Sequence, residues 1–61
     1  MYRHFVDDFG WMALFEGCPG GDVRVVLSAP DGYVVWDKVF SDFDSAIACF
    51  NRLFPRFREV V

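Results

Sequence analysis

Few side chains in this chain could support chemistry, and they lie far apart. His4 is the only histidine, Asp7 and Asp8 are adjacent carboxylates, and Cys18 and Cys49 are the two thiols. A nucleophile–histidine–acid site needs its histidine held rigidly against a Ser or Cys. His4 stands close to a chain end, and nothing in the sequence suggests such support. We therefore predict no catalytic residues and a protein that is not an enzyme.

The same residues give no pattern for a metal or a cofactor. Adjacent carboxylates point to opposite sides of a strand, and Asp7 and Asp8 lack the spacing of a calcium loop. Neither cysteine has the nearby Cys or His that a zinc site needs. Gly17, Gly20 and Gly21 precede a β-branched run and not a helix with Lys and Ser or Thr, as a phosphate-binding loop requires. The sequence thus predicts no metal and no cofactor.

Length and charge narrow the class of partner. The 61 residues predict a single domain, 1–61, with a net charge of −3. Between Phe5 and Asn51 the only bases are Arg24 and Lys38, while acids are frequent in that stretch. Such a surface repels phosphate backbones, so direct binding to nucleic acid is not expected. A protein with a basic, nucleic-acid-binding surface is the favoured partner, although the acids can equally serve solubility alone.

Aromatic content predicts an exposed patch. Apolar types make up 54% of the residues and aromatic types 20%, more large apolar surface than so small an interior can hold. Contiguous exposed apolar patches mark interfaces, either with a second copy or with a foreign protein. No segment has the length of a membrane span, and residues 1–8 lack the apolar stretch of a signal peptide. We predict a cytoplasmic location, with Cys18 and Cys49 as free thiols.

Turn and periodicity signals predict the elements. Segment 29–32, Ala-Pro-Asp-Gly, is a turn between two β-branched runs, and residues 10–16 read as a preceding strand. Ser41 and Asp44 resemble a capping box, an apolar stripe at the 3.6-residue period follows, and Pro55 stops a helix predicted from Asp42 to Phe54. Residues 1–8 and 56–61 are left open between edge strand and turn or frayed end. One face of the strand after the turn is expected to carry Tyr33, Val35 and Val39. The opposite face is expected to carry Val34, Trp36 and Phe40.

The predicted fold is therefore α+β, a three-stranded antiparallel meander with a C-terminal helix on one face, in the order β-β-β-α. One helix cannot cover both faces of this sheet, so the uncovered face is expected to carry some of the large apolar residues. These residues form the candidate surface for a partner or a dimer, because Trp in particular contributes strongly to interfaces. The candidates for the uncovered face are Trp11, Met12, Leu14, Trp36 and Phe40, and the aromatic patch proper is assigned to Trp11, Trp36 and Phe40.

The order of elements over about residues 10–54, with Trp11, Ala13, the Gly32 turn, Phe40 and Ala46, resembles the AP2 and integrase arm-type DNA-binding domains. In those families the sheet enters the major groove through arginines. The corresponding strands and turns here carry mainly acids, namely Glu16, Asp22, Asp31 and Asp37. The resemblance therefore extends to the fold order and not to DNA binding.

As a class, a tiny acidic chain that is rich in aromatics and has no catalytic residues is similar to the small phage-encoded anti-CRISPR proteins. That resemblance implies an inhibitor whose DNA-like acidic surface occupies the PAM or DNA-binding site of a CRISPR surveillance complex, here of type I, in the host cytoplasm. The alternative is a small homodimeric accessory or structural domain whose acids only provide solubility. The candidates for phosphate mimicry are Asp7, Asp8, Asp22, Asp31, Asp37, Asp42 and Asp44.

Overall fold

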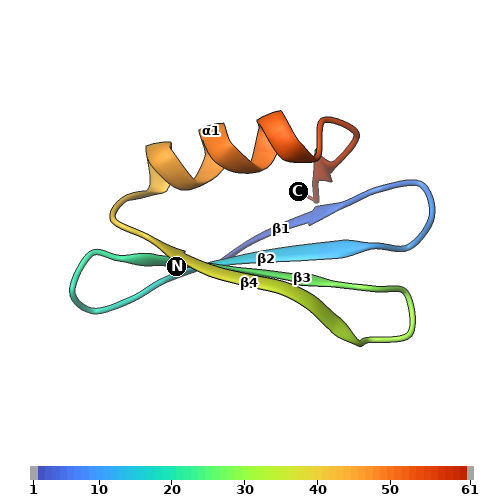
Figure 1. Cartoon of the computed structure of the whole chain (residues 1–61), viewed down its shortest axis with the longest axis horizontal. Helices are drawn as coiled ribbons and strands as arrows, with labels where there is room; N and C mark the ends of the chain where they lie inside the picture. Colours follow the sequence, from blue (N-terminus) through green and yellow to red (C-terminus); the bar gives the residue numbers. More distant parts are fainter. Residues whose placement is uncertain (1, 61) are drawn as a thin grey trace.

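Neighbouring strands of the sheet run in opposite directions, so all five described strands join into one antiparallel sheet. The computed structural model describes residues 2–60, which form five strands and one helix (Figure 1). The spatial order of the strands is β4-β3-β2-β1-β5. In chain order the elements are β1 (Tyr2–Val6), β2 (Met12–Gly17), β3 (Val23–Ser28), β4 (Val34–Phe40), α1 (Phe43–Leu53) and β5 (Arg58–Glu59).

The predicted meander is present as β2, β3 and β4, but the prediction of only three strands was wrong. Both segments that the sequence left open supply a strand. β1 pairs with β2 from Tyr2↔Glu16 to Val6↔Met12, and the two-residue β5 pairs with β1 on the other side. The order of β2, β3, β4 and α1 agrees with the AP2-like order, while β1 and β5 extend the sheet beyond it.

The predicted helix is confirmed almost to the residue, but the predicted cap is wrong. Asp42, and not Ser41, is the N-cap, and its Oδ1 accepts a hydrogen bond of 2.7 Å from the backbone N–H of Ser45. The last helical residue is Leu53, and Phe54 closes the helix by donating its N–H to the Phe50 carbonyl. Pro55 follows directly, as expected from its incompatibility with a continuing helix.

The helix packs on one face of the sheet (Figure 1). The core between them consists of buried apolar side chains from β1, β2, β3 and α1. Phe15 and Phe50 meet edge to face with ring centroids 5.2 Å apart, and Phe5 lies 5.0 Å from Phe15. The fully described core set is Phe5, Ala13, Phe15, Val23, Val25, Leu27, Ala46 and Phe50.

The β3–β4 hairpin turns where the sequence predicted it. Gly32 has φ of +90°, a conformation that L side chains rarely adopt, and Asp31 Oδ1 accepts a hydrogen bond from the Tyr33 N–H. The register then shifts between Leu27 and Ser28, so that Val34 pairs with Ser28. Cross-strand partners share a face, and Val34 therefore lies opposite to the face predicted for it.

Cys18 and Cys49 are free thiols, as predicted. The helix among residues 2–60 is too short and too polar to be a membrane span.

Candidate functional site

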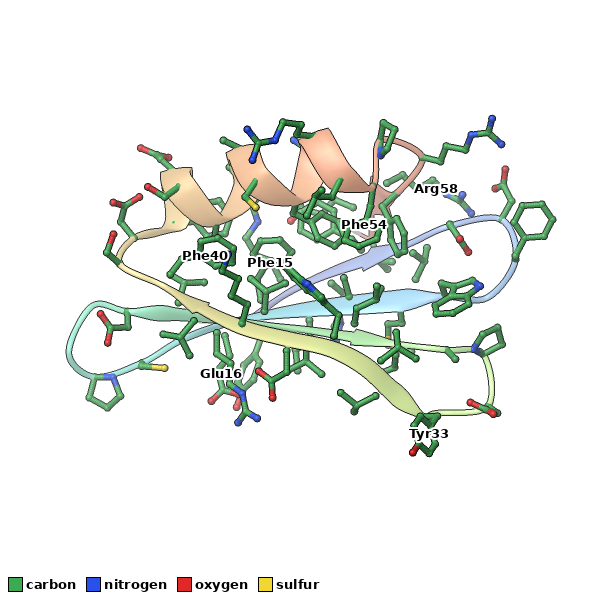
Figure 2. All side chains as sticks on the ribbon, viewed as in Figure 1. Phe15, Glu16, Tyr33, Phe40, Phe54 and Arg58 are labelled. Atoms are coloured by element: carbon green, nitrogen blue, oxygen red, sulfur yellow. The ribbon has the colours of Figure 1, made fainter. Side chains whose placement is uncertain are left out.

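The face of the sheet turned away from α1 is the largest candidate surface. Within residues 2–60 no helix or strand covers it, and Figure 2 shows Glu16 and Tyr33 pointing away from the helix on this side. We call it the open face. The strand register assigns to it Tyr2, His4, Val6, Met12, Leu14, Glu16, Arg24, Val26, Ser28, Val34, Asp37 and Val39.

The open face is apolar along its middle. Leu14 on β2 lies directly opposite Val26 on β3, and both are half-buried by their neighbours in the sheet. Apolar side chains further from this middle are more exposed. Met12, at the start of β2, is 46% exposed, and Val39, on the edge strand β4, is 56% exposed. Val34 and Val35, at the register shift of β4, are exposed to a similar extent. Val6, Met12, Leu14 and Val26 form an apolar strip across β1 to β3, while Ser28 and the Arg24–Asp37 pair separate it from the exposed valines of β4.

Charges of both signs border that strip. Arg24 on β3 and Asp37 on β4 form an ion pair through two side-chain hydrogen bonds, one of them 3.0 Å from Arg24 Nε. The hydrogen bonds that Arg24 donates hold the pKa of the Asp37 carboxyl below its usual value, and the same hydrogen bonds raise the pKa of Arg24. Glu16 is the register partner of Arg24 on the other side. With two acids and one base the open face has a formal charge of −1, compared with −3 for the whole chain.

The three aromatic residues predicted for the exposed patch lie elsewhere, and that prediction was wrong. Trp11, Trp36 and Phe40 are half-buried and pack against the core under α1. The Trp36 ring lies 5.8 Å from that of Phe54 and 6.3 Å from that of Phe40. The two aliphatic candidates, Met12 and Leu14, do lie on the open face.

The reason is the direction of alternation in each strand. Trp36 is the register partner of Leu27, and Phe40 of Val23, so both share the face that the helix covers. Trp11 precedes Met12 by one residue and continues the alternation of β2 on that same side, where it joins the core cluster. The three-turn helix α1 therefore covers more aromatic side chains of the sheet than we expected from the sequence.

The seven candidate acids do not gather on one face. Asp7, Asp8 and Asp31 lie in the β1–β2 and β3–β4 loops at one end of the sheet (Figure 1). Asp22, Asp42 and Asp44 lie at the opposite end, in the β2–β3 loop and at the start of α1. Asp37 stands on the open face between them.

Five of these carboxylates have local partners. Asp7, Asp31 and Asp42 accept hydrogen bonds from backbone N–H groups of their own turns or cap. Asp8 pairs with Arg58 at 2.7 Å, and Asp37 pairs with Arg24. These bonds explain the positions of the acids without reference to a partner.

The contribution of β1 to the open face was not predicted from the sequence. Tyr2, His4 and Val6 add a further row to the open face, because β1 lies beside β2 along its whole length. The signal was a weak alternation in residues 2–6, with Phe5 as the one core residue of the segment.

Within residues 2–60 the positions of the His, Cys, Asp and Glu side chains form no group that could hold a metal ion. Comparisons of the chain with protein-family models, with curated proteins and with solved structures found no match. The geometry of the open face is therefore the main guide to function.

Proposed function

We propose that this domain is a non-catalytic binding protein that acts through its open face, and that the primary occupant of this face is a second copy of the chain. One observation carries the proposal: a sheet face with an apolar strip across β1 to β3 and exposed valines on β4 is left without cover within residues 2–60, while the other face is closed by α1. Contiguous exposed apolar surface of this kind is typical of interfaces.

A stable dimer would bury a large share of the surface of so small a chain. A stable interface needs roughly 800 Å² from each partner. That is about a fifth of the 4203 Å² of accessible surface of this chain. Two sheets pack face to face about 10 Å apart with their strands about 30° from parallel. Stacking of two open faces would place both sheets in the centre and both helices outside.

Charge supports the same occupant. Two copies of a strongly acidic face would repel each other, but the open face carries the Arg24–Asp37 pair and the Glu16–Arg24 register partners. One formal negative charge remains on each face, so two stacked faces repel each other less than the net charge of −3 per chain would suggest.

Sedimentation over a wide concentration range tests the proposal. The wild-type protein should pass from monomer to dimer as concentration rises. Val39→Lys should abolish dimer formation, because it replaces an exposed apolar side chain of the open face with a charge. Leu53→Lys is the matched control, since Leu53 is 51% exposed but lies on the helix, away from the open face. A wild-type protein that stays monomeric at every concentration, or equal effects of the two variants, would refute the proposal.

An acidic inhibitor of a CRISPR surveillance complex, the other function suggested by the sequence, remains a prediction. It needs several carboxylates acting together on one continuous face, whereas the seven candidates divide between two ends of the sheet and one face. Salt separates the two functions. Docking of acids on a basic site weakens steeply as ionic strength rises, while association through an apolar face does not.

A further inference from the structure

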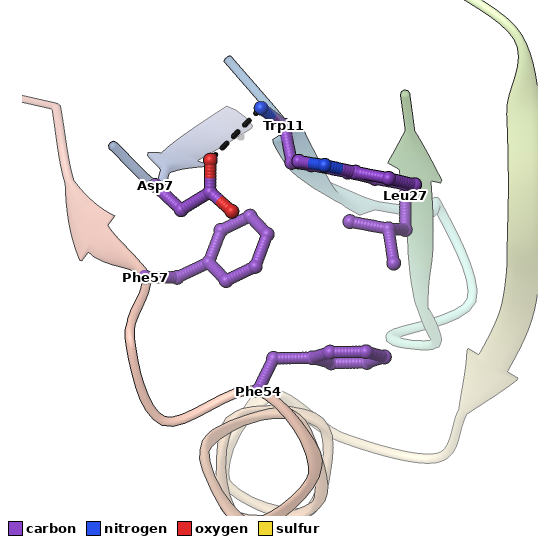
Figure 3. A pocket seen from close by; sticks show the side chains of 5 residues that line it. All are labelled: Asp7, Trp11, Leu27, Phe54 and Phe57. Atoms are coloured by element: carbon purple, nitrogen blue, oxygen red, sulfur yellow. Dashed lines mark hydrogen bonds between the residues drawn. The ribbon is translucent and has the colours of Figure 1, made fainter. Parts of the chain in front are cut away.

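A pocket at one end of the molecule stands apart from the open face. It has a volume of about 230 Å³ and is lined by Asp7, Trp11, Leu27, Phe54 and Phe57. Trp11 and Leu27 belong to the sheet side, whereas Phe54 and Phe57 come from the end of α1 and the segment after it (Figure 3). The pocket therefore opens between the two layers of the fold, where the helix ends and no longer covers the sheet.

Three aromatic rings surround this space. In Figure 3 the rings of Trp11 and Phe54 are seen edge-on at opposite sides of the pocket, each with a face turned inward, and the Leu27 side chain lies between them beside the Trp11 ring. The Phe57 ring stands at the side, 6.0 Å from that of Phe54 and nearly perpendicular to it. All three rings are only half-buried, although they contact the core. Their faces carry the negative part of the aromatic quadrupole, which attracts a cation.

A carboxylate completes the lining. Asp7 Oδ1 accepts hydrogen bonds of 2.9 Å from the Phe9 N–H and 3.0 Å from the Trp11 N–H, which hold the side chain in place. The other oxygen, Oδ2, points toward the pocket (Figure 3). Among the ion pairs formed within residues 2–60, none involves Asp7. Its negative charge is thus positioned by the loop and left for a ligand.

Aromatic rings together with one carboxylate favour one chemical class of ligand. An apolar ligand would use the rings but leave the carboxylate facing a neutral group. A primary ammonium or a guanidinium is a strong hydrogen-bond donor, and a lining with a single free carboxylate oxygen satisfies few of its N–H groups. A methylated ammonium has no N–H to satisfy and carries a diffuse charge, and aromatic faces bind such groups. The volume is below the ~300 Å³ of ordinary drug-sized sites, which suits a ligand of a few heavy atoms.

We propose that the pocket formed by Trp11, Phe54, Phe57 and Asp7 binds a small quaternary ammonium compound such as choline. The rings enclose the methylated head, and the Asp7 carboxylate supplies the counter-charge at the rim. The site lies between the helix end and the sheet, so its occupation does not depend on dimer formation through the open face.

Titration of the whole chain with choline tests this, with the Trp11 indole N–H signal in NMR as the readout. A saturable shift is expected with choline and with tetramethylammonium. The neutral carbon analogue of choline, 3,3-dimethylbutan-1-ol, has the same shape without the charge and should bind at least fivefold more weakly. Equal affinity for choline and this analogue, or the absence of a saturable shift, would overturn the proposal.

Two variants and a control test which residues of the pocket bind choline. Asp7→Asn keeps an oxygen that can accept the two loop hydrogen bonds but removes the charge, and it should weaken choline binding by roughly fivefold or more. Asp8→Asn is the matched control, because Asp8 is paired with Arg58 and does not line the pocket. Phe57→Leu removes a ring and keeps apolar volume, so it should weaken choline more than the neutral analogue. Thermal melting checks that each variant is folded. Unchanged choline affinity in folded Asp7→Asn would refute the role of the carboxylate.

A peptide that carries trimethyllysine separates the two sources of this group. Binding of choline at least as tight as that of the peptide supports a small-molecule ligand. Much tighter binding of the peptide would overturn the assignment to a free compound.

Discussion

The two faces of the sheet are made by the same strands and have opposite fates. On β2 and β3, Phe15 and Val25 are almost completely buried under α1, while Met12 on the other face is 46% exposed. The side chains of both faces are largely apolar. The difference is that the stripe of α1, centred on Ala46 and Phe50, covers one face and nothing within residues 2–60 covers the other. One face therefore stabilises the domain, and the other is available for binding.

The largest expected effect comes from the covered face. Phe50 is fully buried and contacts the rings of Phe5, Phe15, Phe54 and Phe57. Phe50→Ala should lower the free energy of unfolding by ~3–5 kcal/mol, because it removes these contacts and leaves a cavity. In a domain of this size such a loss approaches the whole stability. Chemical denaturation measures it.

Leu53→Ala is the control on the same helix. Leu53 is 51% exposed, and its truncation should change the free energy of unfolding by only about 0.5 kcal/mol. Similar losses for the two variants would mean that the helix does not bury Phe50 as described.

The contrast between the faces also shows what could be predicted from sequence. The hairpin turn and the helix were predictable, because Pro30, Gly32 and Pro55 act locally through their backbone restrictions. The stripe of α1 was predictable because its period is that of a helix. Val23, Val25 and Leu27 stand at alternate positions of β3 and are all buried, as the period of a half-buried strand requires.

The errors arose where a distant segment decides the outcome. β1 is a strand because it pairs with β2, and β5 is a strand because it pairs with β1; a two-residue strand such as Arg58–Glu59 carries almost no local signal. The position of Trp36 depends on the register with Leu27 and on the reach of the Phe54 ring. The number of acids was visible in the sequence, but their division between two ends follows from the topology.

The second prediction compares two residues of β4 that lie three positions apart and on opposite faces of the sheet. Trp36 packs under the helix end, and Val39 stands on the open face. Trp36→Ala should destabilise the fold by about 2 kcal/mol, less than the ~3–5 kcal/mol of a fully buried aromatic residue, because Trp36 is half-buried. Val39→Ala should leave the monomer within about 0.5 kcal/mol of the wild type.

Denaturation at several protein concentrations distinguishes the two effects. If the open face associates, the wild-type midpoint rises with concentration. That dependence should persist in Trp36→Ala at a lower midpoint and should shrink in Val39→Ala. A concentration dependence lost in Trp36→Ala and kept in Val39→Ala would instead assign the interface to the helix side.

The smallest expected effect concerns pH, and it compares carboxylates that have partners with one that does not. Hydrogen bonds from Arg24, from the Ser45 backbone and from Arg3 hold the pKa values of Asp37, Asp42 and Glu59, respectively, below their usual range. A carboxyl whose pKa is lower in the folded state stabilises the fold above its unfolded-state pKa of about 4 and loses this contribution as pH falls through the folded value. The melting temperature should therefore be flat near neutral pH and decline below pH ~4.

Asp37→Asn should make that decline shallower, because it removes one of the three groups. Asp22→Asn is the control and should follow the wild-type curve, because Asp22 forms no ion pair within residues 2–60. The pairs are exposed and screened by salt, so the difference between the variants should shrink at high ionic strength. A decline in Asp37→Asn as steep as in the wild type at low salt would show that the Arg24–Asp37 pair of the open face does not contribute to stability in solution.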